Sequence, residues 1–369
     1  MFLECGDLSR FVGAARTPKE ESGDRSPHSK TMHLSRIPAG MRYYVGEEAR
    51  LRRRVEDAAM SVFDRWAYEE ITTPSVDYYA LFEHGMGTIE AQRAFRFTDQ
   101  DGRLLTLRPD VTSSVARAAA TLLSDRPRPL RLCYAAPVFK QQSQSAAEWR
   151  RENTQLGCEL IGAGDASADL EMLLVAAEIL AQLGLQDSCC ITINHVEIFN
   201  GLAEEFLPDT NAREVVRGLI DRRAIPELNH YSSDAARCKT FADLVHLKGK
   251  REVIHSAQDS ISNARSQRAL GAVADLWEAL EMRGVSELFE IDLGDVSSLD
   301  YYTGLSFKIF VDGAGSRVGG GGRYDRLISN FGAAEPAIGF VLNLDGLTDV
   351  LNSEKSQPQI SRIHTDLKQ

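Results

Sequence analysis

The sequence offers little that would hold a metal ion, form a disulfide or enter a membrane. Its six cysteines include no C-x-x-C pair, and several lie in apolar segments, which indicates reduced thiols packed as small hydrophobic side chains. His195 and His255 are isolated and lack the spacing of metal ligands, so no metal site is predicted. No apolar run reaches the length of a bilayer span and no apolar signal segment opens the chain, so we expect a cytoplasmic protein without a membrane partner.

Acidic residues outnumber basic residues. The chain has 42 Lys and Arg against 53 Asp and Glu, a formal net charge of -11. Broad attraction to nucleic acid or to an anionic membrane depends on clustered positive charge, so this balance argues against both, although it leaves room for a local basic groove. The length and the hydrophobic content are those of an ordinary globular protein. The chain has 369 residues, 43% of them hydrophobic, which is enough for one large domain or two of usual size.

Composition along the chain predicts its division into parts. Residues 1–35 mix polar residues, glycine and proline without apolar periodicity, which predicts a disordered tail. Residues 200–286 have helical patterns and no convincing strand, so we interpret them as a helical insertion. The insertion would separate two parts of one core domain, residues 36–199 and 287–352, and a polar tail at 353–369 would follow.

Apolar spacing predicts helices and strands in the two core parts. From Glu47 it predicts an amphipathic helix of about five turns. Residues 95–99 and 104–107, joined by an Asp-Gly turn, predict a β-hairpin. A strand at 69–76 contains Pro74 and is expected at a sheet edge or an interface. Further strands are predicted at 130–139, 154–161, 189–196, 288–292, 306–311 and 338–342, and further helices at 113–123 and 169–183.

The polar face of the helix that starts at Glu47 carries Arg50 and the run Arg52 to Arg54. A charged helix face of this kind is usually solvated. We therefore predict a solvated face, with contact to a partner protein as the alternative.

Two stretches near the C-terminal end, residues 298–304 (SLDYYTG) and 319–325 (GGGGRYD), predict a small-molecule pocket. Two adjacent tyrosines open an apolar strand, and four glycines are expected to bend the backbone back towards it. Because successive side chains of a strand point to opposite faces, one of Tyr301 and Tyr302 is expected in the core and the other, Tyr302 by preference, in the pocket. The glycines form either a phosphate nest or a tight strand entry with positive φ, and the second reading is favoured.

Five motifs follow one another along the chain: residues 68–74 (YEEITTP), 107–112 (LRPDVT), 138–140 with 155–160 (VFK and QLGCEL), 299–303 (LDYYT), and 320–325 with 336–340 (GGGRYD and PAIGF). In this order they resemble the catalytic core of a class II aminoacyl-tRNA synthetase, and specifically histidyl-tRNA synthetase. The resemblance runs from about residue 37 to about residue 351. It implies an α+β fold, a mainly antiparallel sheet flanked by helices, with a helical insertion.

The positions that serve ATP chemistry in these synthetases are changed. Arginines there stabilise the charge that develops when a carboxylate attacks the α-phosphate. The resemblance puts Lys140, Ser297 and Gly346 at three arginine positions and Gln142 at that of the motif 2 acid. Lysine keeps a point charge without the bidentate fork, and serine and glycine keep neither. Loss of one such donor typically costs about 10² to 10³ in rate, so we interpret these four as degenerate synthetase positions and expect no adenylation.

The positions that bind histidine in these synthetases are retained. Carboxylates for an ammonium group, and hydroxyl or carboxylate oxygens for a ring N–H, are the partners that free histidine needs. Asp110 has an alternative role as a cap of the helix that starts near Val111, and the two can coexist. Gln155 and Glu159 lie on one face of a strand, and the alternative is that they are ordinary polar residues of a half-solvated strand with no ligand. The resemblance assigns histidine binding to Asp110, Thr112, Gln155, Glu159, Tyr301 and Tyr302.

A histidine pocket without ATP chemistry or an anticodon-reading domain resembles the ATP phosphoribosyltransferase regulatory subunits, which are paralogues of the synthetase. This resemblance implies a noncatalytic subunit that acts with a short-form catalytic ATP phosphoribosyltransferase in the first step of histidine biosynthesis and allows feedback inhibition by L-histidine. It also implies a homodimer core within a hetero-oligomer, which in this family is often a hetero-octamer. No cofactor and no tRNA partner are expected. The alternatives are a divergent histidyl-tRNA synthetase or other amino-acid-activating enzyme, and an RNA-binding module built on the same core.

Overall fold

The structure is a computed structural model, and it describes residues 36–141, 149–207, 209–232, 234–296 and 301–356. The chain divides into two compact units, residues 1–38 and 39–369, and every described helix and strand lies in the second unit. The predicted tail at 1–35 and most of that at 353–369 fall outside the described residues. Within the described residues, no helix is both long and apolar enough to cross a membrane.

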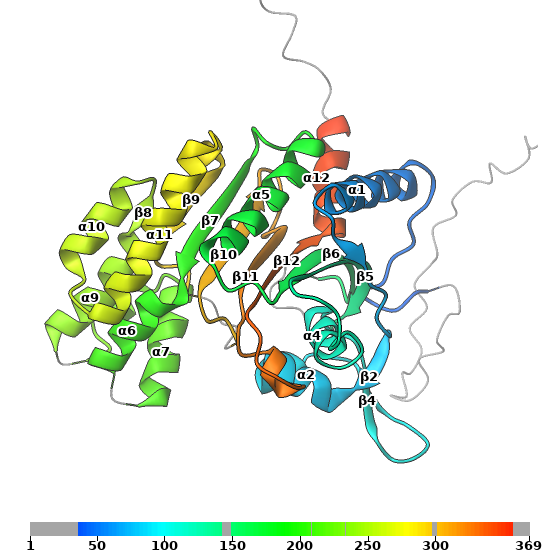
Figure 1. Cartoon of the computed structure of the whole chain (residues 1–369), viewed down its shortest axis with the longest axis horizontal. Coiled ribbons are helices and arrows are strands. Elements are labelled where there is room, and N and C mark those ends of the chain that lie inside the picture. Colours follow the sequence, from blue (N-terminus) through cyan, green and yellow to red (C-terminus); the bar gives the residue numbers. More distant parts are fainter. Residues whose placement is uncertain (1–35, 142–148, 208, 233, 297–300, 357–369) are drawn as a thin grey trace, which may run out of the picture. The chain divides into compact units, whose positions relative to one another are not determined.

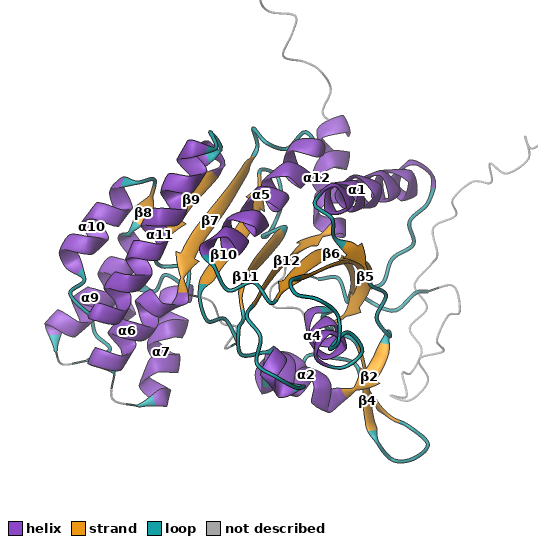
Figure 2. Ribbon diagram, in the orientation of Figure 1, coloured by secondary structure: helices purple, strands orange, loops and turns teal. Residues whose placement is uncertain are grey.

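Most strands belong to one sheet of nine strands (Figures 1 and 2). Their order is β1-β5-β6-β12-β11-β10-β7-β9-β8, and neighbours are antiparallel except for the pairs β1/β5 and β7/β9, so the sheet is mainly antiparallel as predicted. The strands are β1 (Glu69–Glu70), β5 (Leu130–Phe139), β6 (Glu152–Ile161), β7 (Cys189–His195), β8 (Lys248–Gly249), β9 (Phe289–Asp292), β10 (Leu305–Val311), β11 (Gly319–Arg323) and β12 (Ala337–Asn343).

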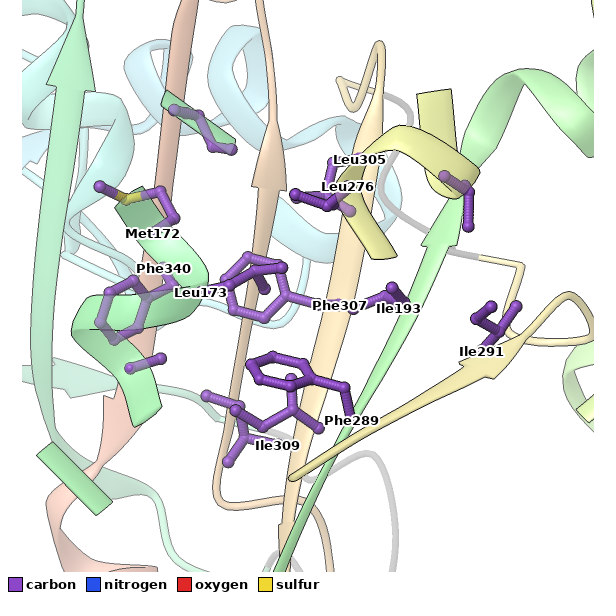
Figure 3. Packing of buried hydrophobic residues seen from close by; sticks show 14 of the residues in the cluster. Met172, Leu173, Ile193, Leu276, Phe289, Ile291, Leu305, Phe307, Ile309 and Phe340 are labelled. Atoms are coloured by element: carbon purple, nitrogen blue, oxygen red, sulfur yellow. The ribbon is translucent and has the colours of Figure 1, made fainter. Parts of the chain in front are cut away.

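Each face of this sheet has its own hydrophobic core, because successive side chains of a strand point to opposite sides. On one face Phe289, Phe307 and Phe340 pack with Met172 and Leu173 of α5 (Ala166–Gln182), as Figure 3 shows. Helices α1 (Gly46–Arg65), α11 (Ala264–Met282) and α12 (Leu344–Ser356) contribute to the same core. On the other face, side chains of β5 pack with α4 (Thr112–Ala120).

Local sequence signals fix where several helices begin. The side chain of Asp165 accepts a hydrogen bond from the Ser167 N–H at the start of α5, and that of Asn263 accepts from Arg265 and Ser266 at the start of α11. Such caps satisfy N–H groups that have no partner within the helix. Helix α1 has the predicted five turns and buries Leu51, Val55, Ala59, Val62 and Phe63.

Residues 196–282 are mostly helical. Their helices are α6 (Val196–Phe206), α7 (Thr210–Asp221), α8 (Ile225–Leu228), α9 (Ala235–His246), α10 (Glu252–Ser260) and α11. Phe241 of α9 and Trp277 of α11 belong to the same buried cluster as the sheet residues, so this region shares a core with the sheet. The short strand β8 was not predicted; it pairs with β9 at the edge of the sheet. The division of the chain into core and insertion stays a prediction.

A second, small sheet contains the predicted hairpin. It has the order β2 (Val76–Tyr78), β4 (Leu104–Leu107), β3 (Arg96–Thr98), and Gly102 in the turn has a φ of 78°. The single strand predicted at 69–76 is wrong, because β1 ends at Glu70 and β2 starts only at Val76. The chain passes there from one sheet to the other through Pro74, which has no N–H to donate. Strand β1 does lie at a sheet edge, as predicted.

The glycine run does not bend the chain. Residues 319–322 form most of β11, inside the nine-stranded sheet, and none has a positive φ, so the predictions of a bend, a phosphate nest or a strand entry with positive φ are wrong. Glycine is required here for space: a Cβ on Gly321 would lie 2.3 Å from the Gly339 carbonyl oxygen, and one on Gly320 would lie 2.8 Å from that of Phe307.

Candidate ligand-binding site

A cavity of about 680 Å³ lies over the glycine strand, within the size range of small-molecule sites. Gln155 of β6 and Ser306 and Lys308 of β10 line it, and their neighbours in sequence point into the large core on the opposite face of the sheet. The floor is therefore the sheet itself. Walls come from the start of α4, from residues 313–318 between β10 and β11, and from the first turns of α12.

Five of the six residues assigned to histidine binding line this cavity. They are Asp110, Thr112, Gln155, Tyr301 and Tyr302. The sixth, Glu159, does not line the cavity: it is 1% exposed and lies on the same face of β6 as Gln155, where it accepts a hydrogen bond from the Thr112 hydroxyl. The structure thus brings all six together from three separate stretches of sequence, while their contact with a ligand stays a prediction.

Glu159 is the centre of a buried cluster of hydroxyl groups. Its Oε1 accepts hydrogen bonds from Thr112 Oγ1 at 2.8 Å and Tyr134 Oη at 3.0 Å, and its Oε2 accepts from the Tyr324 hydroxyl. Burial raises the pKa of Glu159 from 4.5 to about 7, and the three hydroxyl donors oppose this rise. The carboxylate therefore holds the Thr112 hydroxyl, and with it one wall of the cavity, in a fixed position.

Tyr134 and Tyr324 were not singled out from the sequence as site residues. Tyr134 lies on β5 opposite Gly157 of β6, and a Cβ on that glycine would be 2.6 Å from the tyrosine ring. Gly339 of β12 is paired with Glu159 in the same way, and a Cβ there would lie 1.7 Å from Glu159 Oε2. A glycine therefore lies opposite Tyr134 and another lies opposite Glu159, and these glycines are the sequence signal for the hydroxyl cluster. The signal can be recognised only when the strand register is known.

Asp110 lies at the cavity and also contacts the first turn of α4, and its role in histidine binding stays a prediction. Its carboxylate lines the cavity and accepts hydrogen bonds from Ser113, 3.3 Å to the backbone nitrogen and 3.4 Å to the hydroxyl, at the first turn of α4. Burial raises the pKa of Asp110, and the charge of Lys140 lowers it in part. An additional positive group in the cavity would stabilise this carboxylate further.

Gln155 has an acceptor without a partner. Its Oε1 is buried and makes no hydrogen bond to any described residue. A buried polar atom in this state costs about 1 to 3 kcal/mol. Because Gln155 also lines the cavity, a ligand that donates an N–H to this oxygen would remove the cost.

Tyr302 lines the cavity as predicted, but Tyr301 lines it too and both pack against the core, so the predicted division between core and pocket is wrong. The strand β10 begins at Leu305, and the alternation rule does not apply to Tyr301 and Tyr302. Their ring centroids are 4.9 Å apart with an interplanar angle of 67°, and Tyr301 also contacts the ring of Tyr324 at 6.0 Å. A Cβ on Gly322 would come within 2.9 Å of the Tyr302 ring, so this glycine makes room for it.

Of the four positions that we interpreted from the sequence as degenerate synthetase positions, Lys140 and Gly346 line the cavity. Lys140 follows the last residue of β5, and its N–H donates to the Arg151 carbonyl at 2.8 Å. Gly346 is in the first turn of α12 and contributes no side chain. Gln142 and Ser297 fall outside the described residues.

The arginine face of α1 is only partly solvated. Arg50 and Arg53 pair with exposed or partly exposed glutamates on their own helix, as predicted for a solvated face. Arg52 is different: it is 15% exposed and pairs with the carboxylate of Asp345 in α12, which is buried. That carboxylate also accepts hydrogen bonds from the Tyr44 hydroxyl and, at 2.8 Å, from the Thr154 N–H. The sequence analysis missed this pair because its members are 293 residues apart.

No group of three or more His, Cys, Asp and Glu side chains in the described part of the chain could hold a metal ion. The cavity instead offers carboxylate, hydroxyl and amide oxygens close to aromatic rings and to several basic side chains. Such a lining suits a small zwitterion with a planar ring, since both of its charges and its ring find partners.

Comparison with known proteins agrees with this architecture. The family model described as histidyl-tRNA synthetase matches residues 40–347. An ATP phosphoribosyltransferase regulatory subunit from Moorella thermoacetica is 34% identical over 315 residues, 84% of this chain and 80% of the relative. Another from Syntrophotalea carbinolica is 36% identical over 327 residues, 87% of this chain and 76% of the relative.

A solved structure shows the same fold. The crystal structure of an ATP phosphoribosyltransferase regulatory subunit/histidyl-tRNA synthetase from Bacillus halodurans matches with a TM-score of 0.80 at 31% identity, over 87% of this chain and 84% of that chain. The predicted α+β fold of the class II synthetase core is therefore confirmed. The chain belongs to the family of ATP phosphoribosyltransferase regulatory subunits, and its fold is that of the histidyl-tRNA synthetase core.

Proposed function

We propose that the cavity binds free L-histidine and that the chain performs no chemistry with it. In this proposal the chain is the noncatalytic regulatory subunit of a short-form ATP phosphoribosyltransferase. Histidine, which is the end product of the pathway, is the effector for feedback inhibition. The observation that carries the proposal is the set of polar groups that meet in one cavity: the Asp110 carboxylate, whose charged form is disfavoured by burial, and the Gln155 Oε1 without a partner, beside the Thr112 hydroxyl.

The α-ammonium group of the ligand fits the acidic wall. Asp110 supplies a carboxylate whose charged form is disfavoured by burial, and an ammonium group would offset that effect. The Thr112 hydroxyl gives its hydrogen to Glu159, so its oxygen is left as an acceptor for a ligand N–H.

The imidazole ring fits the aromatic and amide groups. Tyr301 and Tyr302 give the cavity aromatic surface, and Gln155 Oε1 is an acceptor for a ring N–H. Glu159 is a positioning residue in this scheme, because its two oxygens already accept three hydroxyl groups and it does not line the cavity. Its role is to hold Thr112 and the tyrosine hydroxyls in place.

The absence of adenylation is part of the proposal. Lys140 lacks the bidentate geometry of an arginine fork, and Gly346 has no side chain to contact a phosphate. Both positions line the cavity, where an adenylating enzyme would need fixed cations at the transferred group. A histidine-dependent exchange of pyrophosphate into ATP by the purified chain would overturn this part and favour the divergent synthetase.

The test of histidine binding is calorimetry on the full-length chain, alone and mixed with the short-form catalytic subunit of the same organism. We expect L-histidine to bind and other amino acids not to. Coupling to a partner's substrate is typically about 1 to 3 kcal/mol, a factor of about 5 to 150, and must be reciprocal. D110N and Q155A should weaken binding, whereas R326A, an exposed arginine outside the cavity, should not. Binding of other amino acids without histidine would refute the proposal.

The proposal includes the assembly that the family resemblance implies, a homodimer core within a hetero-oligomer. Strand β1 supports it, because β1 ends the nine-stranded sheet and its outer side pairs with no strand in the described part of the chain. Native mass spectrometry of the chain with and without the catalytic subunit is the test. A monomer under both conditions would count against the assembly and leave the histidine site untouched.

A further inference from the structure

Four basic side chains line the cavity, and three of them already act on acidic neighbours. Arg150 Nη1 lies 2.8 Å from Asp349 Oδ2. Lys308 pairs with the carboxylate of Asp295. The remaining two basic residues are Lys140, whose charge acts on Asp110, and Arg317.

Arg317 is the basic side chain of the cavity that has no such partner. It is exposed, and it forms no ion pair or hydrogen bond with any residue in the ranges that the structure describes. Its positive charge lowers the pKa of the Tyr302 hydroxyl, against the larger rise caused by burial, so the guanidinium acts on the tyrosine that lines the cavity. Arg317 therefore combines access to solvent with a position at the ligand site.

The backbone next to Arg317 is held firmly. Val318 is buried, its N–H donates to the Ile309 carbonyl at 2.8 Å, and its carbonyl accepts from the Asn343 N–H at 2.7 Å. These bonds fix residue 318 between β10 and β12. The side chain of Arg317 thus extends from an anchored backbone, so binding of an anion costs side-chain entropy but little backbone entropy.

We propose that Arg317 determines specificity for the carboxylate of the bound amino acid. The inference rests on the proposed function, because it assigns the second charge of the same zwitterion. Asp110 on one wall is matched to the ammonium group, and Arg317 on another wall is the cation available for the carboxylate. A guanidinium can bind a carboxylate through two parallel hydrogen bonds, which a lysine cannot reproduce. Arg317 thus supplies a guanidinium group, which neither Gly346 nor Lys140 has.

The test compares L-histidine with histamine, which has the same ring and ammonium group but no carboxylate. Calorimetry uses the full-length chain as wild type, R317Q and R317K, with R326Q as the matched control at an exposed arginine outside the cavity. We expect R317Q to weaken L-histidine about tenfold, or about 1.4 kcal/mol, and to leave histamine unchanged. R317K should recover part of the loss, and R326Q should behave as wild type.

The outcomes separate the inference from the proposed function. If wild type binds L-histidine and R317Q keeps the same ratio of histidine to histamine affinity, the role of Arg317 is refuted while the histidine site stands. If K140Q instead weakens the binding of L-histidine and leaves that of histamine unchanged, Lys140 binds the ligand carboxylate and the inference is wrong. If wild type binds neither compound, both the site and the inference fall.

Discussion

Replacing Glu159 by glutamine removes the charge from the buried hydroxyl cluster and keeps its shape. In the wild type, the folded protein holds the Glu159 proton more tightly than the unfolded chain, because burial raises the pKa from 4.5 to about 7. The stabilisation from this proton is complete below pH 4.5 and is lost as the pH rises to about 7. Glutamine is neutral throughout, so E159Q should not lose stability in this window.

The size of the effect follows from the two pKa values. Each tenfold change in proton affinity is worth about 1.4 kcal/mol, so the full displacement corresponds to about 3 kcal/mol. Between about pH 5 and about pH 8, wild type should lose about 2.5 kcal/mol of unfolding free energy from this group. The carboxyl is fully buried, so solvent screening does not reduce the figure.

Urea unfolding at these two pH values measures the effect. We expect the unfolding free energy of E159Q, relative to wild type, to rise by about 2.5 kcal/mol from the lower to the higher pH. T112V is the matched control, because it removes one hydroxyl donor to the carboxylate and leaves the carboxyl able to titrate. A difference between E159Q and wild type that is the same at both pH values would refute the reasoning.

Two further variants test how the site is built. G339A should destabilise the fold by about 1 to 3 kcal/mol, since its Cβ would lie 1.7 Å from a carboxylate oxygen of the paired strand. G271A is its control: a Cβ there meets nothing within 4 Å and should stabilise α11 by up to about 1 kcal/mol. R52A should cost about 3 kcal/mol, because it leaves the buried Asp345 carboxylate without its cation. R53A, whose ion pair is largely exposed, should cost less than about 1 kcal/mol. Thermal unfolding of the four variants in one buffer compares each variant with its control. Equal changes in stability for G339A and G271A would contradict the need for glycine at 339, and equal changes for R52A and R53A would contradict a buried ion pair at Arg52.

Six residues in or beside the cavity could be named from the sequence because each belongs to a short motif that resembles one of the histidyl-tRNA synthetases. Asp110 and Thr112 lie in a short segment between a hairpin and a helix, and Gln155 lies on a strand with clear alternation. Their convergence followed from the resemblance to a known fold, since residues this far apart in sequence cannot be brought together by periodicity. The long strands and α1 were predicted from spacing alone.

The errors have a common physical cause. Whether the glycines of β11 turn or extend depends on what lies beside them, and the neighbouring carbonyl groups of β10 and β12 are distant in sequence. The Arg52 pair depends in the same way on α12 lying against α1. Tyr134 looked like one more apolar strand residue, because its hydroxyl bond to Glu159 requires knowledge of the register between β5 and β6.

The four glycines of strand β11 limit how this site could be redesigned. At each of residues 319–322 an added Cβ would meet a backbone oxygen of a neighbouring strand within 2.8 Å, and backbone cannot move aside as a flexible side chain can. A protein engineer who wants a different ligand therefore cannot reshape the part of the floor that β11 forms by substitution. New selectivity has to come from the side chains around it, such as Asp110, Gln155 and Arg317, which can be exchanged while β11 stays intact.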